Sequence, residues 1–371
     1  MAISTRRKVC TAGIGSRDGS NDGENRFLSS FLTGKTLDFG AAQSSKADDE
    51  YPADAYSTPR QILFIATVCM SMFTNQLGLC NILTTLKIIG DDFGISTPGQ
   101  LSWLIAGYSL TVGTFILISG RLGDEFGNKK MFVIGMSWLS LWSLVAGLSV
   151  YSNHVLFIFA RVLQGIGPAM ALPNALAIFA KSFSERPRNM AFAWFAATSP
   201  YGSVTGLICG PLFALVWWPW IFWTQAIGIA FVAAFAAWTI PDIHIHDEQK
   251  PPLRERLDRL DLPGGAAGVF TLVLFNFAWN QAVVATWKQP YVYVCLILSF
   301  IFGVVFFYIE IYRARYPILP IAAFNADVSF VFACTAAGWG TFGIWVSTYL
   351  DWETIQLNLS AVFLRCASMP R

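Results

Sequence analysis

The sequence predicts an all-α polytopic membrane protein, and three observations lead to that prediction. Hydrophobic residues make up 54% of the 371 residues and charged residues only 13%, whereas soluble domains carry roughly 25% charged residues. Nine apolar runs follow one another, each near the ~20 residues that a helix needs to cross a bilayer. Only Arg161 and Glu310 carry a charge inside these runs. A large soluble protein with buried helices does not explain nine such runs in series.

The nine runs set the order of the expected elements. Residues 1–60 hold eight basic and eight acidic residues, and we expect a disordered cytosolic N-terminal tail there. The first six runs are expected to form a six-helix transmembrane bundle within residues 61–241. Residues 264–312 hold a further pair of spans, residues 313–350 a loop and the ninth span, and residues 351–371 a C-terminal tail. The runs are 62–84, 101–119, 131–151, 155–180, 190–215, 220–240, 264–283, 291–312 and 328–350.

The placement of lysine and arginine predicts the orientation of the spans. The loops after spans two, four, six and eight contain twelve of these residues, and the loops after spans one, three, five and seven contain two. Cytoplasmic loops of membrane proteins carry the excess of positive charge. The N-terminus is therefore expected in the cytosol and the C-terminus outside. The run WWPWIFW, residues 217–223, then lies at the outer surface, where tryptophan belts occur.

The longest expected cytosolic loop, residues 242–263, is interpreted as an amphipathic linker. Leu253, Leu257 and Leu260 recur at helical spacing with charged residues between them, which is the pattern of a short helix on a membrane surface. A plain solvated linker is the alternative. His244 and His246 stand in the same loop, but two histidines without a third ligand do not predict a metal site.

Several classes of function find no support in the sequence. The net charge of +2 gives no indication of nucleic-acid binding. The seven cysteines are scattered without a CxxC pair, so no disulfide framework, metal site or cofactor is expected. His154 is the only histidine near a span, and no nucleophile can be paired with a base, which disfavours an enzyme.

The segment GRLGDEFGNKK, residues 120–130, lies between spans two and three. Its glycines allow a tight turn, and its pattern resembles the signature loop G-x-L-a-D-r-x-G-r-k of the major facilitator superfamily. Glu125 and Asn128 depart from that pattern, because the family usually has arginine there. The resemblance implies that Asp124 latches one conformation by docking against the other six-span half, with a simple hairpin loop as the alternative. The matching positions are Gly120, Leu122, Gly123, Asp124, Gly127 and Lys129.

Arg161 is expected about 9 Å below the outer edge of span four, at 1.5 Å per residue. A charge there normally faces the bundle interior, here on one face with Gln164 and Pro168, and snorkelling to the outer interface is the alternative. The stretch resembles the fourth-helix motif R-x-x-q-G-x-g of the same superfamily, and this resemblance implies a role in proton coupling. Asn75 and Gln76, in the middle of span one, are expected either to line a substrate cavity or to bridge helices.

Gly202, Gly206 and Gly210 recur every fourth residue in span five and form a smooth ridge for close helix packing, with Pro200 and Pro211 able to bend the helix. The stretch SPYGSVTGLICGP resembles the fifth-helix motif of antiporters, g-x-x-x-G-P-x-x-G-G. The match is partial, since one proline and one glycine of the motif are replaced. The resemblance implies a hinge surface, and ordinary helix packing is the alternative.

WPWIFWTQAIGI at the start of span six and DLPGG at the start of span seven also resemble the fungal fourteen-span drug:proton antiporters. This resemblance runs from about residue 60 to about residue 345. It implies a major facilitator fold with an N-terminal six-helix bundle, two insert helices and one helix of the second half. Nine runs are five fewer than fourteen, so we expect a chain truncated after the ninth span.

The resemblance implies secondary active efflux of small amphiphilic organic compounds, such as drugs, toxins or secondary metabolites, by proton antiport. Its partners would be the lipid bilayer, the organic substrate and protons, with another transporter chain that supplies the missing half as a further candidate. Its place would be the plasma membrane or, alternatively, the vacuolar membrane. Proton coupling rests on the resemblance alone, because the single carboxylate of the spans, Glu310, lies near the end of its span. Alternating access requires two bundles, so the chain alone is expected to be inactive. A non-transporting membrane partner of a full-length transporter chain is the alternative.

Overall fold

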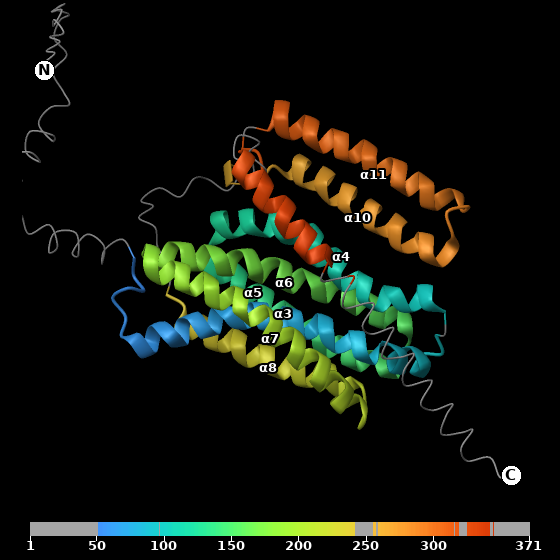
Figure 1. Cartoon of the computed structure of the whole chain (residues 1–371), viewed down its shortest axis with the longest axis horizontal. Coiled ribbons are helices and arrows are strands. Elements are labelled where there is room, and N and C mark those ends of the chain that lie inside the picture. Colours follow the sequence, from blue (N-terminus) through green and yellow to red (C-terminus); the bar gives the residue numbers. More distant parts are fainter. Residues whose placement is uncertain are drawn as a thin grey trace, which may run out of the picture. The chain divides into compact units, whose positions relative to one another are not determined.

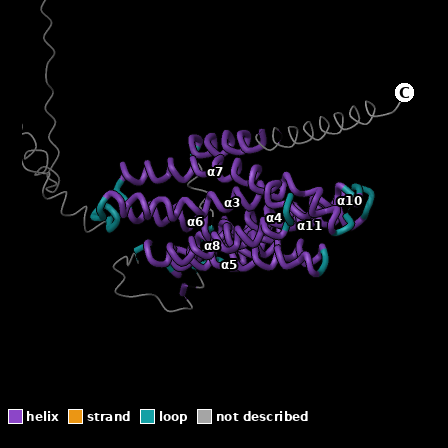
Figure 2. The backbone as a smooth tube through the Cα atoms, turned by 90° about the horizontal axis from the view of Figure 1, so that it is seen from below, coloured by secondary structure: helices purple, strands orange, loops and turns teal. Residues whose placement is uncertain are grey.

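The computed structural model describes residues 51–95, 97–241, 255–256, 259–314, 316–318, 325–341 and 344. Within these residues the regular elements are helices and no strand occurs (Figure 2). Residues 1–50 of the predicted tail lie outside the described residues, as do Leu253 and Leu257 of the predicted linker helix, the end of the ninth span and residues 351–371. Of the predicted linker helix, Glu255 and Arg256 are helical, whereas Arg259 and Leu260 form a turn.

Eight predicted spans each coincide with a long helix. In the described residues, seven helices are long and apolar enough to cross a membrane. Helix α7 is not among them, because serine, threonine, proline and glycine occupy its middle. Residues 326–341, which include the start of the predicted ninth span, are helical as well. The labelled helices are α3 (Thr58–Asp92), α4 (Pro98–Phe126), α5 (Asn128–Leu148), α6 (His154–Ser182), α7 (Glu185–Ala214), α8 (Pro219–Thr239), α10 (Leu262–Ala285) and α11 (Pro290–Tyr308), which continues into the π-helical turn Ile309–Arg313.

Residues 120–126 differ from the expected loop. Helix α4 continues through Phe126, and the turn to α5 consists of the single residue Gly127. The φ angle of Gly127 is 104°, in the left-handed region that favours glycine. The fall in hydropathy at residue 120 therefore marks the end of the apolar stretch and not the end of the helix.

Two apolar clusters occupy opposite ends of the helices α3 to α8. One contains Phe64 near the start of α3 and Phe179 near the end of α6. The other contains Ile89 near the end of α3 and Phe157 near the start of α6. Because lipid tails are as apolar as these side chains, their contribution in a membrane comes from close packing. Buried polar side chains of the middle of the helices lie between the two clusters.

The residues just before α3 pack against the bundle, although the sequence assigns them to the tail. Ala53 is wholly buried, and its N–H donates to the carbonyl of Ser182 at 3.1 Å. The side chain of Asp54 accepts a hydrogen bond from the N–H of Ser184 at 3.0 Å. Backbone hydrogen bonds of this kind carry no hydropathy signal, which explains why the sequence places the tail boundary too late, at residue 60.

Helix α10 lies between α4 and α11 (Figure 1). Ser299 of α11 donates to the carbonyl of Thr271 at 3.1 Å, which joins the two insert helices. The indole of Trp103 in α4 donates to Gln281 Oε1 at 3.1 Å. The two insert helices are thus attached to the bundle through one face of α4.

Candidate functional site

The side chain of Arg161 lies in the interior of the bundle. It is wholly buried, so it does not snorkel to the outer interface. Its Nη1 donates to Gln164 Oε1 at 2.5 Å, and its Nη2 donates to the carbonyl of Gly78 at 3.2 Å. Gln164 Nε2 in turn donates to Ser143 Oγ at 2.6 Å. The guanidinium also lies 4.3 Å from the centre of the Tyr108 ring, within cation–π range.

The chain of polar contacts continues from Tyr108 to α3 and α7. Tyr108 Oη donates to Asn75 Oδ1 at 2.9 Å. Asn75 Nδ2 donates to Gln76 Oε1 at 3.2 Å, and Gln76 Nε2 donates to Ser203 Oγ at 3.4 Å. We call these side chains the polar network. Its members, in order, are Ser143, Gln164, Arg161, Tyr108, Asn75, Gln76 and Ser203, contributed by the five helices α3 to α7.

The structure brings together the four polar residues that the sequence selects in spans one and four. The sequence does not select Tyr108, Ser143 and Ser203, which complete the network. A single tyrosine or serine in an apolar helix is common and has no characteristic spacing, so no signal in the sequence distinguishes these three.

The charge of Arg161 is balanced by dipoles. None of the ion pairs among the described residues includes Arg161. The partners of its guanidinium are a carbonyl, an amide oxygen and the rings of Tyr108 and Phe222, while its Nε is buried without a hydrogen-bond partner in the described part of the chain. A buried charge with so few compensating groups is costly. Arg161 therefore dominates the electrostatics of the bundle interior.

One end of the polar network reaches a pocket. The pocket has a volume of about 400 Å³, within the range of ~300–1,000 Å³ that is usual for small-molecule sites. Gln76 and Ser203 belong to both the network and the pocket wall. The other lining residues are Ser199 and Pro200 of α7 and Thr335, Gly338 and Trp339 of the helical residues 326–341.

The predicted glycine ridge of α7 faces α3. A Cβ added at Gly202, Gly206 or Gly210 would lie 2.5, 2.8 and 2.6 Å, respectively, from a carbonyl oxygen of α3. Real side chains do not approach a backbone oxygen this closely, so α3 and α7 can adopt this spacing only because these positions are glycines. Pro200 lies on the same helix, within the wall of the 400 Å³ pocket.

The predicted latch residue Asp124 has a described partner within the same bundle. Lys181 Nζ, at the end of α6, lies 3.0 Å from Asp124 Oδ1. Lys181 also donates to Asn128 Oδ1 at 2.7 Å, and Asn128 Nδ2 donates to Asn174 Oδ1 at 2.9 Å. Docking of Asp124 against another half stays a prediction. At the same end of the bundle lie the remaining predicted latch positions, Gly120, Leu122, Gly127 and Lys129.

Glu125, which departs from the family pattern, contacts the segment before α10. Its carboxylate lies 3.7 Å from Arg256 Nε and 3.9 Å from Arg259 Nη1. A hydrogen bond to the Glu255 side chain raises the pKa of Arg259 above its ordinary value. With the ion pair to Lys181, these contacts show that the segments after α4, α6 and α8 meet at one end of the bundle. The orientation predicted from lysine and arginine requires these segments to lie on the same side of the membrane.

The profile of the Major Facilitator Superfamily matches residues 64–369, most of the chain. The chain belongs to this superfamily. It is therefore an all-α, multi-pass integral membrane protein of a transporter family, as the sequence predicts. The matched range includes residues 351–369, for which the sequence alone shows no family pattern.

Curated relatives give the branch of the superfamily. Efflux pump terG of Aspergillus terreus is 61% identical over 311 residues, which cover 83% of this chain and 59% of the relative. The low affinity ammonium transporter of Saccharomyces cerevisiae is 43% identical over 337 residues, which cover 88% of this chain and 64% of the relative. The major facilitator superfamily multidrug transporter mdr3 of Aspergillus fumigatus is 41% identical over 258 residues, which cover 67% of this chain and 48% of the relative. The predicted resemblance to fungal efflux transporters is confirmed, and the chain spans less than two thirds of the length of these relatives.

Proposed function

We propose that this protein takes part in secondary active efflux of small amphiphilic organic compounds, driven by proton antiport. The observation that carries the proposal is the polar network, which connects the buried charge of Arg161 with a pocket of about 400 Å³ at Gln76 and Ser203. The pocket lies between α3, α7 and the helical residues 326–341, and transporters of alternating access bind their substrates at the interface between their two halves. The relatives named as efflux pumps support export as its direction.

Each part of the site has a distinct role in this proposal. Gln76 and Ser203 offer hydrogen bonds to the substrate, and Trp339 offers an aromatic face. Arg161 and Gln164 lie in the coupling region and hold the network in one arrangement. The α7 glycine ridge is the hinge surface against α3, and Asp124 latches one conformation by docking against the other half of the transporter.

The direct test reconstitutes the purified chain in vesicles with an imposed proton gradient and follows a fluorescent amphiphilic dye. A parallel sample carries the chain joined to the remaining part of the terG relative, since alternating access requires two bundles. We expect dye movement in the joined protein that stops when an ionophore collapses the gradient. Dye movement that ignores the gradient would contradict proton antiport, and no binding or movement of any amphiphile would contradict the efflux role.

We also propose that the N-terminus is cytosolic and that the protein lies in the plasma membrane. The segments that meet at one end of the bundle hold most of the basic residues, and such segments face the cytosol. The test introduces Ser184→Cys into a cysteine-free background and applies an impermeant thiol reagent to intact cells. We expect labelling only after the membrane is permeabilised. Labelling in intact cells would reverse the orientation.

A second candidate function is that of a membrane partner that binds a full-length transporter. The helical residues 326–341 favour it, since their side chains are exposed and include Phe330 and Val331 at 68% and 61%. An exposed apolar helix beside a pocket offers a surface for further helices. Co-purification with a tagged terG relative, without dye efflux by the chain alone, would support this candidate over the first.

A further inference from the structure

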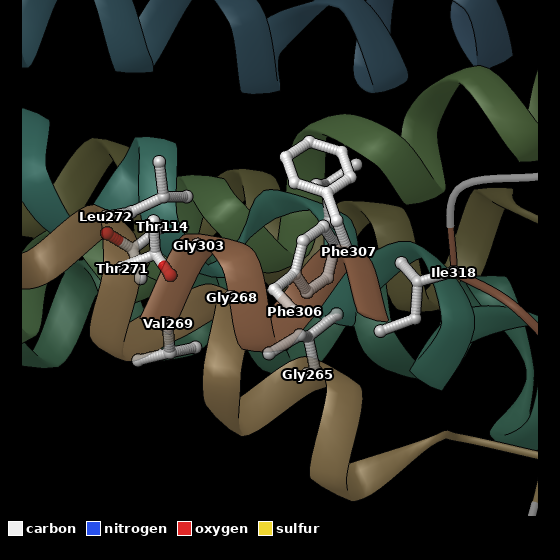
Figure 3. Close-up of a pocket in the computed structure, with 12 residues that line it drawn as sticks. Thr114, Gly265, Gly268, Val269, Thr271, Leu272, Gly303, Phe306, Phe307 and Ile318 are labelled. Carbon is white, nitrogen blue, oxygen red and sulfur yellow. The ribbon is translucent and has the colours of Figure 1, made fainter. Parts of the chain in front are cut away.

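A second cavity lies between α4, α10 and α11, away from the polar network. Its volume is about 220 Å³, and it is lined by twelve residues, ten of which have no polar side chain. Figure 3 shows Gly265 and Gly268 of α10 facing Gly303 and Phe306 of α11, with Ile318 at one end. The cavity exists because glycines stand where side chains would otherwise fill the space between the helices.

The cavity offers no free side-chain hydrogen-bond donor to a polar ligand. Its two hydroxyl groups are already committed, since Thr114 Oγ1 donates to the carbonyl of Leu110 at 2.7 Å and Thr271 Oγ1 to the carbonyl of Ala267 at 2.8 Å. A buried water needs two to four polar partners, and apolar cavities of ~150 Å³ stay dry and take up apolar molecules. Water and polar solutes are therefore excluded from this space.

The mouth of the cavity opens sideways, into the medium around the helices. Three of its lining side chains, Leu117, Leu272 and Phe307, are 43%, 41% and 56% exposed. All three belong to helices that are long and apolar enough to span a membrane. In a bilayer the medium at such a mouth is lipid hydrocarbon, so an acyl chain can enter without crossing water.

Two arginines lie at the end of the cavity at Ile318: Arg259, which also pairs with Glu125 and Glu255, and Arg121, which none of the ion pairs among the described residues includes. The carbonyl of the preceding Pro317 accepts a hydrogen bond from Arg121, and the guanidinium of Arg259 lies 5.8 Å from the centre of the Tyr316 ring. Arginines at this position can attract a phosphate, as basic pockets between membrane helices do. Each phospholipid carries a phosphate next to its acyl chains, so the charges and the apolar cavity fit the same molecule.

From these observations we propose that the cavity binds one acyl chain of a phospholipid, with the phosphate near Arg121 and Arg259. The lipid fills the space between α4 and the insert helices, which touch directly near Trp103 and Gln281. The site is distinct from the transport pocket, so it does not depend on the proposed efflux. The sequence predicts its basic end on the cytosolic side, which assigns the lipid to the inner leaflet.

The test uses photo-crosslinking in phosphatidylcholine vesicles that contain the unaltered chain. The probe is a phosphatidylcholine with a diazirine in the middle of one acyl chain, and labelled peptides are mapped after irradiation. We expect labelling concentrated on residues 264–272 and 303–307, above that of lipid-facing positions such as Phe231, which is 72% exposed. Uniform labelling of α8, α10 and α11 would overturn the proposal.

Filling the cavity provides the matched comparison. Gly265→Leu and Gly303→Leu place side chains into it, since an added Cβ would already have neighbours at 3.5 Å at both positions. Either variant should lower the labelling of both peptides about tenfold, the change that ~1.4 kcal/mol of lost binding produces. Gly113→Leu on α4, where a Cβ would meet nothing within 4 Å, should leave the labelling unchanged.

Two further outcomes would contradict the proposal. Unchanged labelling in both filled variants would show that the probe does not occupy the cavity. Loss of labelling when an excess of an amphiphilic dye is added would assign the cavity to transported compounds and not to lipid. If the filled variants do not fold, native mass spectrometry of the unaltered chain decides, because a bound phospholipid should survive repeated detergent exchange and its absence would refute the site.

Discussion

Two glycine-lined contacts, the α3–α7 interface and the part of the α10 interface around Gly265, are packed in opposite ways. At the α3–α7 interface the glycines bring two backbones together, so an added Cβ would lie 2.5–2.8 Å from a carbonyl oxygen. At the interface of α10 with α4 and α11, a Cβ at Gly265 or Gly268 would lie 3.5 or 3.3 Å from its nearest neighbour, and a cavity of about 220 Å³ stays open. At these two contacts glycine therefore indicates close helix packing where it faces the backbone of the neighbouring helix, and not where it faces side chains.

The two interfaces also differ in whether they contact the proposed transport site. The tight interface adjoins the polar network through Ser203 and the 400 Å³ pocket, whereas the open interface contacts neither. We therefore expect changes on the α3–α7 side to affect transport and changes on the α10 side to affect lipid contacts.

The largest expected effect is that of Arg161→Ala. Removing the guanidinium leaves Gln164, Gly78 and Tyr108 without their shared partner, so the network loses its arrangement. Export by the joined protein should fall below detection, while membrane abundance stays normal, because alanine is less costly in a bilayer than arginine. Dye efflux and quantitative membrane blots measure the two. Normal export would show that the network has no part in transport.

A matched Arg161→Lys variant sharpens this result. Lysine keeps the charge but loses the planar fork that reaches two acceptors at once. We expect export between that of the alanine variant and that of the unaltered protein. If lysine restores export fully, charge alone matters and the hydrogen-bond geometry does not.

The next effect is that of Gly202→Ala on stability. The added methyl group would lie 2.5 Å from the backbone oxygen of Phe73, which cannot move as a side chain does. Overpacking of this kind costs roughly 1–3 kcal/mol. Thermal unfolding in detergent should show a clearly lower midpoint. An unchanged midpoint would mean that α3 and α7 are not in direct backbone contact.

A smaller effect is expected for Glu125→Gln. The substitution removes the ion pairs with Arg256 and Arg259, at 3.7 and 3.9 Å. Pairs that are partly exposed contribute less than about 1 kcal/mol, and salt screens them. The unfolding midpoint should fall slightly at low ionic strength and match the unaltered protein at high ionic strength. A large, salt-independent loss would assign Glu125 a different structural role.

The smallest effect is that of Gly265→Ala, the control for the tight interface. The new methyl group would lie 3.5 Å from Ile118, an ordinary contact distance. We expect a change in stability within about 0.5 kcal/mol, measured by the same thermal unfolding. A loss as large as that of Gly202→Ala would show that the α10 interface is packed as tightly as the α3–α7 interface.

Hydropathy was sufficient to predict the fold because the spans are long and almost without charge, and all of the labelled helices except α7 are strongly apolar. Glu125 and Phe126 show its limit, because helix α4 continues beyond the membrane span that hydropathy detects. Arg161 and Gln164 could be selected from their spacing on one face of span four. Their partners on α3, α4 and α5 depend on how five helices pack, and no pattern within one helix contains that information.

The polar network has a consequence for the response of the protein to pH. Amide and hydroxyl side chains neither gain nor lose protons in the physiological range, and arginine stays protonated. The members of the network are of these kinds, apart from the phenol of Tyr108, which ordinarily stays neutral up to about pH 10. The network therefore holds the same charge at every physiological pH. A proton that drives transport must act through a group outside the network, and the network would transmit that change as a shift in geometry.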